Sequence, residues 1–200
     1  LHLLNYLLGE TLPPGNYLLP VSLGGLSGQG DASINIDKET VANYFVIKQG
    51  GPINRDHWTV TANTEEKTGE VSAAYPHNGQ TISLIDGEIN TFWHSKWQGG
   101  EVAPPYEIIL DMGKENSVSQ LGLIARQNAL TSMNLEIYAG DDGETWNLIG
   151  KYFFDGSIKT EQMVPVKACD ARWIRLYIPT LGSGSSVGHL AEIYVYGTDK

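Results

Sequence analysis

Residues 134–150, NLEIYAGDDGETWNLIG, decide the fold class of this chain. Apolar and polar side chains alternate on both sides of a short loop, which is the pattern of two strands that each bury one face. Asp142 and Gly143 are residues that a tight hairpin turn favours. The stretch therefore predicts an antiparallel β-hairpin. We interpret the neighbouring carboxylates of Asp141 and Asp142 as turn formers and not as an acid/base pair.

Similar strand signals recur along the chain, separated by turn residues at intervals of about ten, as in all-β sandwiches. No long stretch shows the 3.6-residue period of a helix. The chain is therefore predicted to be all-β. The further runs are NYLLPVSL (16–23), SINI (33–36), NYFVIK (43–48), HWTVTA (57–62), TISLI (81–85), YEIILDM (106–112), QLGLIA (120–125), EQMVPV (161–166), RWIRLYI (172–178) and AEIYVYG (191–197).

A domain boundary is predicted at KQGGPINRD, residues 48–56, where two glycines and a proline interrupt the strand pattern. Residues 1–50 hold too few strands to bury a core of their own. We expect them to be the C-terminal part of a larger β-rich domain. Residues 51–200 hold enough strands for a complete two-sheet sandwich. The apolar N-terminal stretch LHLLNYLL lacks a basic leading segment and is not expected to be a signal peptide.

The charge balance restricts the possible partners. The 200 residues include 13 Lys and Arg against 23 Asp and Glu, a net charge of −10. This argues against nucleic acid and against an anionic membrane surface, because both are bound through clustered basic residues. No apolar run is long enough to span a membrane, so direct insertion is not expected. The single cysteine, Cys169, excludes an internal disulfide and is interpreted as a buried structural thiol.

Oxygen-bearing side chains gather in LIDGEINTFWHSKW, residues 84–97. Calcium takes six to eight oxygen ligands from carboxylates, carbonyls and hydroxyls. Asp86 offers a carboxylate, Thr91 a hydroxyl, and Gly87 allows the backbone to curl around an ion. A second carboxylate from elsewhere in the chain would be needed. On these residues alone, a simple Asp-Gly turn with Thr91 starting the next strand is the favoured interpretation, because Asp-Gly turns are common.

The order of motifs after residue 56 resembles a discoidin domain, also called the coagulation factor 5/8 type C domain. Within that superfamily it is most similar to the bacterial family 32 carbohydrate-binding modules. The resemblance implies an eight-stranded jelly-roll (galactose-binding-like) β-sandwich over residues 51–200. The motifs that carry it are LIDGEINTFWHSKW (84–97), PPYEIILDMG (104–113), IARQN (124–128), LEIYAGDDGETWNLIG (135–150), ARWIRLYIPT (171–180) and AEIYVYG (191–197).

The resemblance also implies a structural calcium ion that joins the first strands to the last one. It assigns to that ion the carboxylates of Asp86 and Glu192 and the oxygens of Thr91. Backbone carbonyls would complete the shell, from Ser83, Glu88 and Ala191. Trp93 is then expected to be a core anchor beneath the turn.

The sugar site that the resemblance implies lies on loops at one end of the sandwich. Arg126 and Asn128 fall where the family places a sugar-binding arginine and a recurring asparagine. Tyr106 is a candidate that stands where galactose-binding members often have a histidine, so the resemblance does not imply galactose specificity. The other candidates are Trp97, as an exposed aromatic, together with His94 and Tyr75. A structural role for His94, bonded to the turn backbone, is an equal alternative.

The loop TLGSGSSVGHLAE contains a G-x-S-x-G pattern from Gly184 to Gly188 with Ser186 at its centre. A nucleophile elbow needs a strand before it and a helix after it. A strand is expected after this loop, so we interpret it as a flexible loop. With no metal-hydrolase spacing or phosphate-cradling loop in the sequence, the chain is expected not to be an enzyme.

The first 50 residues resemble the end of a domain of unknown function found in gut-bacterial surface lipoproteins, through LPPGNYLLPVSL (12–23) and ETVANYFVIK (39–48). The resemblances together imply non-catalytic binding of a glycan or polysaccharide by an extracellular or cell-surface protein. That protein is expected to be an outer-membrane lipoprotein whose anchor is not in this chain. Adhesion to other surface proteins is one alternative. The other is an accessory domain that has lost sugar binding.

Overall fold

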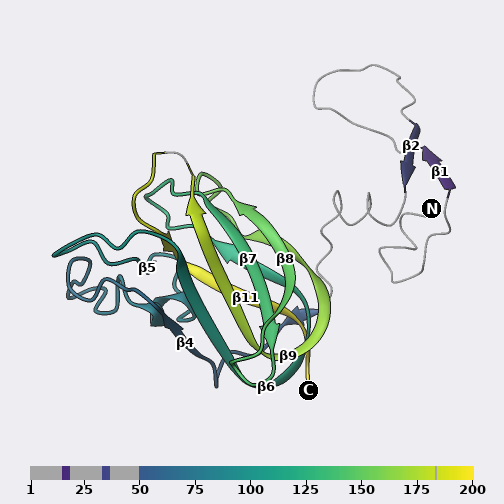
Figure 1. The fold of residues 1–200 in the computed structure, drawn as a ribbon, viewed down its shortest axis with the longest axis horizontal. Coiled ribbons are helices and arrows are strands. Elements are labelled where there is room, and N and C mark those ends of the chain that lie inside the picture. The colour runs from purple at the N-terminus through teal and green to yellow at the C-terminus, as the bar shows by residue number, and fades with distance from the viewer. Residues whose placement is uncertain (1–14, 19–32, 37–49, 183) are drawn as a thin grey trace. The chain divides into compact units, whose positions relative to one another are not determined.

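A computed structural model describes residues 15–18, 33–36, 50–182 and 184–200. The chain divides into two units, residues 1–47 and residues 48–200, and each is described by itself (Figure 1). The described part of the first unit is a small antiparallel pair of strands, β1 (Gly15–Leu18) and β2 (Ser33–Ile36). The predicted strand at 43–48 lies outside the described residues.

The second unit is built on a seven-stranded antiparallel sheet in the order β3-β11-β6-β9-β7-β8, with β4 paired to β6. A separate pair, β5 (Trp93–His94) with β10 (His189–Leu190), joins the loops at one end. The all-β sandwich predicted from the sequence is confirmed. The sheet strands are β3 (Gly51–Pro52), β4 (Thr59–Ala62), β6 (Tyr106–Ile124), β7 (Met133–Gly140), β8 (Asn147–Phe154), β9 (Gln162–Leu181) and β11 (Glu192–Asp199).

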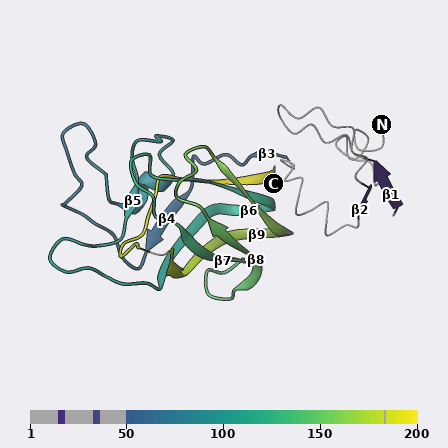
Figure 2. The same cartoon turned by 90° about the horizontal axis from the view of Figure 1, so that it is seen from above.

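The two long strands β6 and β9 are shared by the two layers of the sandwich: one half of each strand belongs to one layer and the other half to the second (Figures 1 and 2). Residues 106–111 of β6 pair with β4 and with the second half of β9, whereas residues 116–124 pair with β11 and the first half of β9. The register shifts between Asp111 and Asn116, where the strand bends. Gly113 adopts φ 77° there, a conformation that favours glycine. The runs 106–112 and 120–125 are therefore one strand and not two.

Alternation of apolar residues along these strands fills the space between the layers. In β6, Tyr106, Ile108, Leu110 and Met112 are buried, and the residues between them are partly exposed. Trp93 is fully buried, as predicted for a core anchor, and its indole N–H donates to the carbonyl of Thr64 at 2.8 Å. Its ring meets that of Tyr106 edge to face at 5.8 Å, a favourable geometry for two aromatic rings.

The predicted strand at 81–85 is wrong. Residues Thr81–Leu84 form a 3-10 helix, η1, because side-chain hydrogen bonds to residues earlier in the chain compete with strand pairing. The hydroxyl and N–H of Thr81 both donate to Glu65 Oε2, at 2.6 and 2.9 Å. The hydroxyl of Ser83 donates to the carbonyl of His77. Across the described ranges, no helix has the length and apolar character needed to cross a membrane.

Candidate functional site

The turn after η1 is held by its own oxygen atoms. The hydroxyl oxygen of Thr91 lies 2.9 and 2.7 Å from the two carboxylate oxygens of Asp86 and 2.7 Å from the carbonyl oxygen of Glu88, and its one proton is available to one of these acceptors at a time. The N–H of Glu88 donates to Asp86 Oδ1 at 2.8 Å. Gly87 has φ 87°, which lets the chain fold back at this point. Three predicted metal-ligating residues, Asp86, Glu88 and Thr91, are thus brought together.

Glu192, at the start of β11, reaches the same turn from the far end of the sequence. Its side chain is fully buried, and its Oε1 accepts the N–H of Gly87 at 2.7 Å. Its Oε2 accepts Nη1 of Arg55 at 2.6 Å. Burial, together with the nearby carboxylate of Asp86, raises the pKa of Glu192 to about 7 against the opposing effect of the Arg55 guanidinium.

This donor set fits a hard cation. Two carboxylates, a hydroxyl and a carbonyl are oxygen ligands of the kind that calcium takes. The raised pKa of Glu192 means that positive charge at the turn would favour its ionised form. Ala191, next to Glu192, is fully buried, and its N–H donates to Ile124, whereas the Ser83 hydroxyl is bonded to His77. Nowhere in the described ranges do three His, Cys, Asp or Glu side chains converge to hold a metal, so an ion here would need neutral oxygens as well.

A second polar group forms where β6 ends. Nη1 and Nη2 of Arg126 each lie 3.4 Å from one carboxylate oxygen of Glu70. Nε of Arg126 donates to Asn128 Oδ1 at 2.9 Å. The guanidinium lies 3.7 Å from the centre of the Phe92 ring, a cation–π contact that fixes its plane. His94 completes this group, which we call the Arg126 cluster (Glu70, His94, Arg126 and Asn128), with Nε2 3.9 Å from Glu70 Oε1.

His94 makes the structural backbone bond that was one of its two predicted roles, and its role as a ligand residue stays a prediction. Nδ1 of His94 lies 2.6 Å from the carbonyl of Ser95, a structural bond, while Nε2 faces Glu70. The His189 ring lies 5.5 Å from that of His94, and its Nε2 lies 2.8 Å from the Thr131 hydroxyl. Burial lowers the pKa of His94, and burial with the neighbouring His94 and Arg126 lowers the pKa of His189 to about 3. Both rings are therefore neutral at pH 7.

Glu66 ties together the two loops that border the cluster. Its Oε1 accepts the N–H groups of Thr68 and Gly69, and its Oε2 accepts those of Trp97 and Gln98, at 2.8 to 3.1 Å. Burial opposes ionisation of this carboxylate, but the four N–H donors lower its pKa to about 2. Trp97 packs over Gly69, where an added Cβ would lie 2.5 Å from the indole ring. Trp97 therefore lies against the residue that precedes Glu70, and 38% of Trp97 is exposed.

Of the remaining predicted ligand residues, Tyr106 is buried in the core, and Tyr75 stays a prediction. Tyr106 is fully buried in the core, and its hydroxyl donates to the carbonyl of Val102 at 2.8 Å, so its ring offers no face to a sugar. This corrects the prediction, because Tyr106 belongs to the inward-facing set of β6. Tyr75 is 40% exposed and its N–H bonds to Ser72. Among the described residues no hydrogen bond joins Tyr75 to the Arg126 cluster.

Sequence reasoning missed Glu70, Glu66 and Arg55, which act on residues far away in the chain. It also missed Lys159, whose ammonium group donates to the carbonyls of Arg126, Ala129 and Gly156 and so holds the loop after β6. No local pattern marks these residues.

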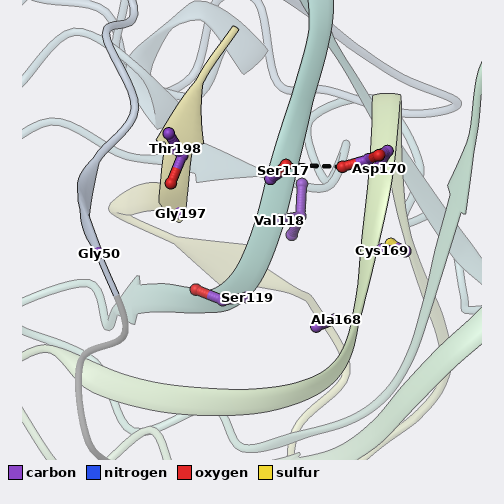
Figure 3. Close-up of a pocket in the computed structure, with 9 residues that line it drawn as sticks. All are labelled: Gly50, Ser117, Val118, Ser119, Ala168, Cys169, Asp170, Gly197 and Thr198. Carbon is purple, nitrogen blue, oxygen red and sulfur yellow. Dashed lines mark hydrogen bonds between the residues drawn. The ribbon is translucent and has the colours of Figure 1, made fainter. Parts of the chain in front are cut away.

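A hollow of about 470 Å³ lies away from both sites (Figure 3). In Figure 3 the hydroxyl of Ser117 points to Asp170, to which it donates at 2.6 Å. The lining is of small side chains with no cluster of titratable groups, so we do not assign the function to it. The lining residues are Gly50, Ser117, Val118, Ser119, Ala168, Cys169, Asp170, Gly197 and Thr198. Cys169 is half-buried and burial raises the pKa of its thiol, which disfavours a reactive thiolate.

The G-x-S-x-G loop is followed by β10 and not by a helix, so the nucleophile-elbow geometry is absent from this described part of the chain. The Ser186 hydroxyl donates to Glu101, at 3.3 Å. The nearby His189 is buried and bonded to Thr131.

Comparison with known proteins gives consistent matches. The F5/8 type C domain family model matches residues 59–193. A sialidase from Micromonospora viridifaciens is 34% identical over 125 residues, which are 60% of this chain and 19% of the sialidase. The chain thus spans about a fifth of the length of the curated relatives it matches first.

Solved structures agree with the family match. The C-terminal domain of a chitobiase from Bacteroides fragilis superposes with a TM-score of 0.64 at 35% identity, over 74% of this chain and 98% of that domain. The family 32 carbohydrate-binding module of NanJ from Clostridium perfringens, solved in complex with galactose, has a TM-score of 0.58 and 28% identity. That match covers 72% of this chain and 97% of the module.

Proposed function

Because the chain belongs to the F5/8 type C domain family, we propose that residues 51–200 are a non-catalytic carbohydrate-binding module with its sugar site at the Arg126 cluster. The observation that carries this proposal is the open geometry of the Arg126–Glu70 pair. Charge-assisted N–H···O bonds are about 2.7–2.9 Å long. Both contacts of this pair measure 3.4 Å, so the guanidinium and the carboxylate retain capacity for ligand hydroxyls.

A second arginine–carboxylate pair in the same domain shows the contrast. Arg172 and Asp111 form a closed pair with two bonds of 2.7 and 2.8 Å. Such a pair satisfies its own groups and needs no ligand. The Arg126–Glu70 pair is also partly exposed, with 16% and 19% of the side chains accessible. It therefore presents donors and acceptors side by side, as recognition of neighbouring hydroxyls requires.

The charge of the cluster favours a neutral sugar. Arg126 and Glu70 carry opposite charges, and the lowered pKa values of His94 and His189 keep both rings neutral at pH 7. Trp97, with 38% of the residue exposed, supplies apolar surface over Gly69, the residue that precedes Glu70. A sugar ring presents a C–H face to such surface while its hydroxyls bond to the cluster. The galactose complex of the NanJ module is consistent with this chemistry.

The same proposal includes a structural calcium ion at the turn of residues 86–91. Asp86, Thr91, Glu88 and Glu192 would hold it, with further carbonyls from Ser83 and Ala191. The ion would supply positive charge between two carboxylates that belong to opposite ends of the domain. Weak calcium sites suit extracellular modules, where the ion is abundant. We place the protein outside the cell or at the cell surface.

The test is glycan binding by the whole chain in millimolar calcium, measured on an array and then by calorimetry. Arg126→Ala and Glu70→Gln are expected to abolish binding to the glycan that the wild-type chain selects. Trp97→Ala is expected to weaken it. Arg172→Ala is the matched control, because it removes an arginine from the closed pair far from the cluster, and should bind like wild type.

Circular dichroism of each variant shows that it remains folded. If the folded, calcium-loaded chain selects no glycan, the carbohydrate proposal fails for this chain. Adhesion to another surface protein or a purely structural role then becomes the favoured reading. If Arg126→Ala and Glu70→Gln bind as well as wild type, the sugar site lies elsewhere.

A further inference from the structure

Glu192 is a buried carboxylate whose two oxygens already have partners. Oε1 accepts the N–H of Gly87 at 2.7 Å, and Oε2 accepts Nη1 of Arg55 at 2.6 Å. The Glu192 side chain has no exposed surface, whereas 22% of the Arg55 side chain is accessible. A buried carboxylate needs a compensating positive charge or donor. In this domain the arginine supplies that charge from within the chain.

Arg55 is held in this position by its surroundings. Its guanidinium lies 4.4 Å from the centre of the Tyr194 ring, two residues along β11 from Glu192. The N–H of Ile53 donates to the carbonyl of Val195 and so keeps the segment before Arg55 beside β11. An added Cβ on Gly87 would lie 3.4 Å from Nη2, which shows that the guanidinium also borders the turn. The Arg55 guanidinium therefore contacts Glu192 and also borders the turn of residues 86–91.

We propose that Arg55 is a built-in counter-ion for Glu192 that competes with calcium at the turn of residues 86–91. This inference rests on the calcium part of the proposed function. A calcium ion that takes Oε2 of Glu192 as a ligand must displace the guanidinium or share the oxygen with it. Arg55 thus has two opposed effects: it stabilises the calcium-free domain, and it weakens calcium binding.

The experiment measures calcium affinity and thermal stability of the full chain carrying Arg55→Gln. Calcium dissociation constants come from calorimetry, and melting temperatures are recorded in chelator and in millimolar calcium. Arg55→Gln should bind calcium about tenfold more tightly or better, because no internal ion pair has to be broken first. It should also melt below wild type in chelator and show the larger gain of melting temperature with calcium.

Arg172→Gln is the matched control, since it removes an arginine–carboxylate pair of similar length away from the turn. Its calcium affinity should equal that of wild type. Arg55→Lys keeps the charge on a side chain that cannot stack or form the same fork. It should give a smaller gain in calcium affinity, and it serves as the deciding variant if Arg55→Gln does not fold in either condition.

The outcomes separate the two proposals. Equal or weaker calcium binding by the folded Arg55 variants, with wild type binding calcium, overturns the competition and leaves the calcium site in place. Calcium binding by Arg55→Gln but not by wild type supports the competition in its strongest form. If neither protein binds calcium, both the calcium site and this inference are wrong, while sugar binding at the Arg126 cluster is judged by its own test.

Discussion

Replacing Glu66 by glutamine tests the reasoning about how the loops beside the Arg126 cluster are held. Glu66 is 2% exposed and accepts four backbone N–H groups from two loops that are about 30 residues apart in sequence. Glutamine has the same shape, but one of its two terminal atoms is an NH₂ group. That group would face two N–H donors, which would lose their acceptor.

The expected loss of stability follows from those two bonds. A hydrogen bond to a charged group contributes about 1.5 kcal/mol or more, so two lost bonds give about 3 kcal/mol. The low pKa of Glu66 gives the same order: a change from 4.5 to about 2 corresponds to about 3 kcal/mol in favour of the ionised form. In a domain of this size about 3 kcal/mol lowers Tm by roughly 6–12 °C.

The assay is chemical and thermal unfolding of the whole chain at pH 7, followed by tryptophan fluorescence. Glu144→Gln, at an exposed position of the β7–β8 loop, is the control and should unfold like wild type. Glu66→Gln should also shift the emission of Trp97 and weaken glycan binding, because the indole and Glu70 lie on the released loops. If the free energy of unfolding of the Glu66→Gln chain lies within about 0.5 kcal/mol of that of the control, Glu66 does not hold the two loops together, since changes of that size are typical of surface positions.

Three further predictions concern a buried histidine, the hairpin turn and the loop after β6. The pKa of His189 is lowered to about 3 in the folded state. Below pH 6.5 the unfolded chain therefore binds a proton at this residue and the folded chain does not. The free energy of unfolding should fall between pH 6.5 and pH 3, by up to about 1.4 kcal/mol per pH unit. Urea unfolding at several pH values checks this, and His189→Gln should flatten the curve. Asp142→Ala removes the acceptor of two N–H groups and of the Thr145 hydroxyl and should lower Tm by less than Glu66→Gln does; an unchanged Tm in a thermal scan would contradict the turn assignment. Lys159→Met removes the ammonium group that holds the carbonyls of the loop after β6. Calorimetry should show glycan binding weakened several-fold while the chain stays folded. Unchanged affinity would mean that other contacts fix the loop.

The architecture of the second unit could be predicted from the sequence because strand alternation is a local signal. Residues 134–154 form β7 and β8 as the opening hairpin indicates, and Asp142 accepts the N–H groups of its turn. Residues 81–85 also show a strand-like composition, but the bonds from Thr81 to Glu65 make a 3-10 helix there. That competing interaction comes from 16 residues away and leaves no mark in the run itself.

The site residues that sequence reasoning missed share this long-range character. Glu70 meets Arg126 across 56 residues, and Arg55 meets Glu192 across 137. Each is an ordinary surface-type residue until the fold brings its partner close. The structure joins Arg126 to Asn128, two residues that the resemblance assigned to a sugar site and whose ligand role stays a prediction. The resemblance also pointed to Tyr106, because a shared motif does not show that the side chain at this position faces the core.

The passage of β6 and β9 through both layers has a consequence for how the domain comes apart. In a sandwich of separate sheets, one layer can detach while the other keeps its hydrogen bonds. Here two strands are common to both layers, so opening one layer pulls on the pairing of the other. Slow amide exchange at the two ends of β6 should therefore report the same opening event. Under a pulling force, such a domain would resist as one mechanical element and then unfold in a single step.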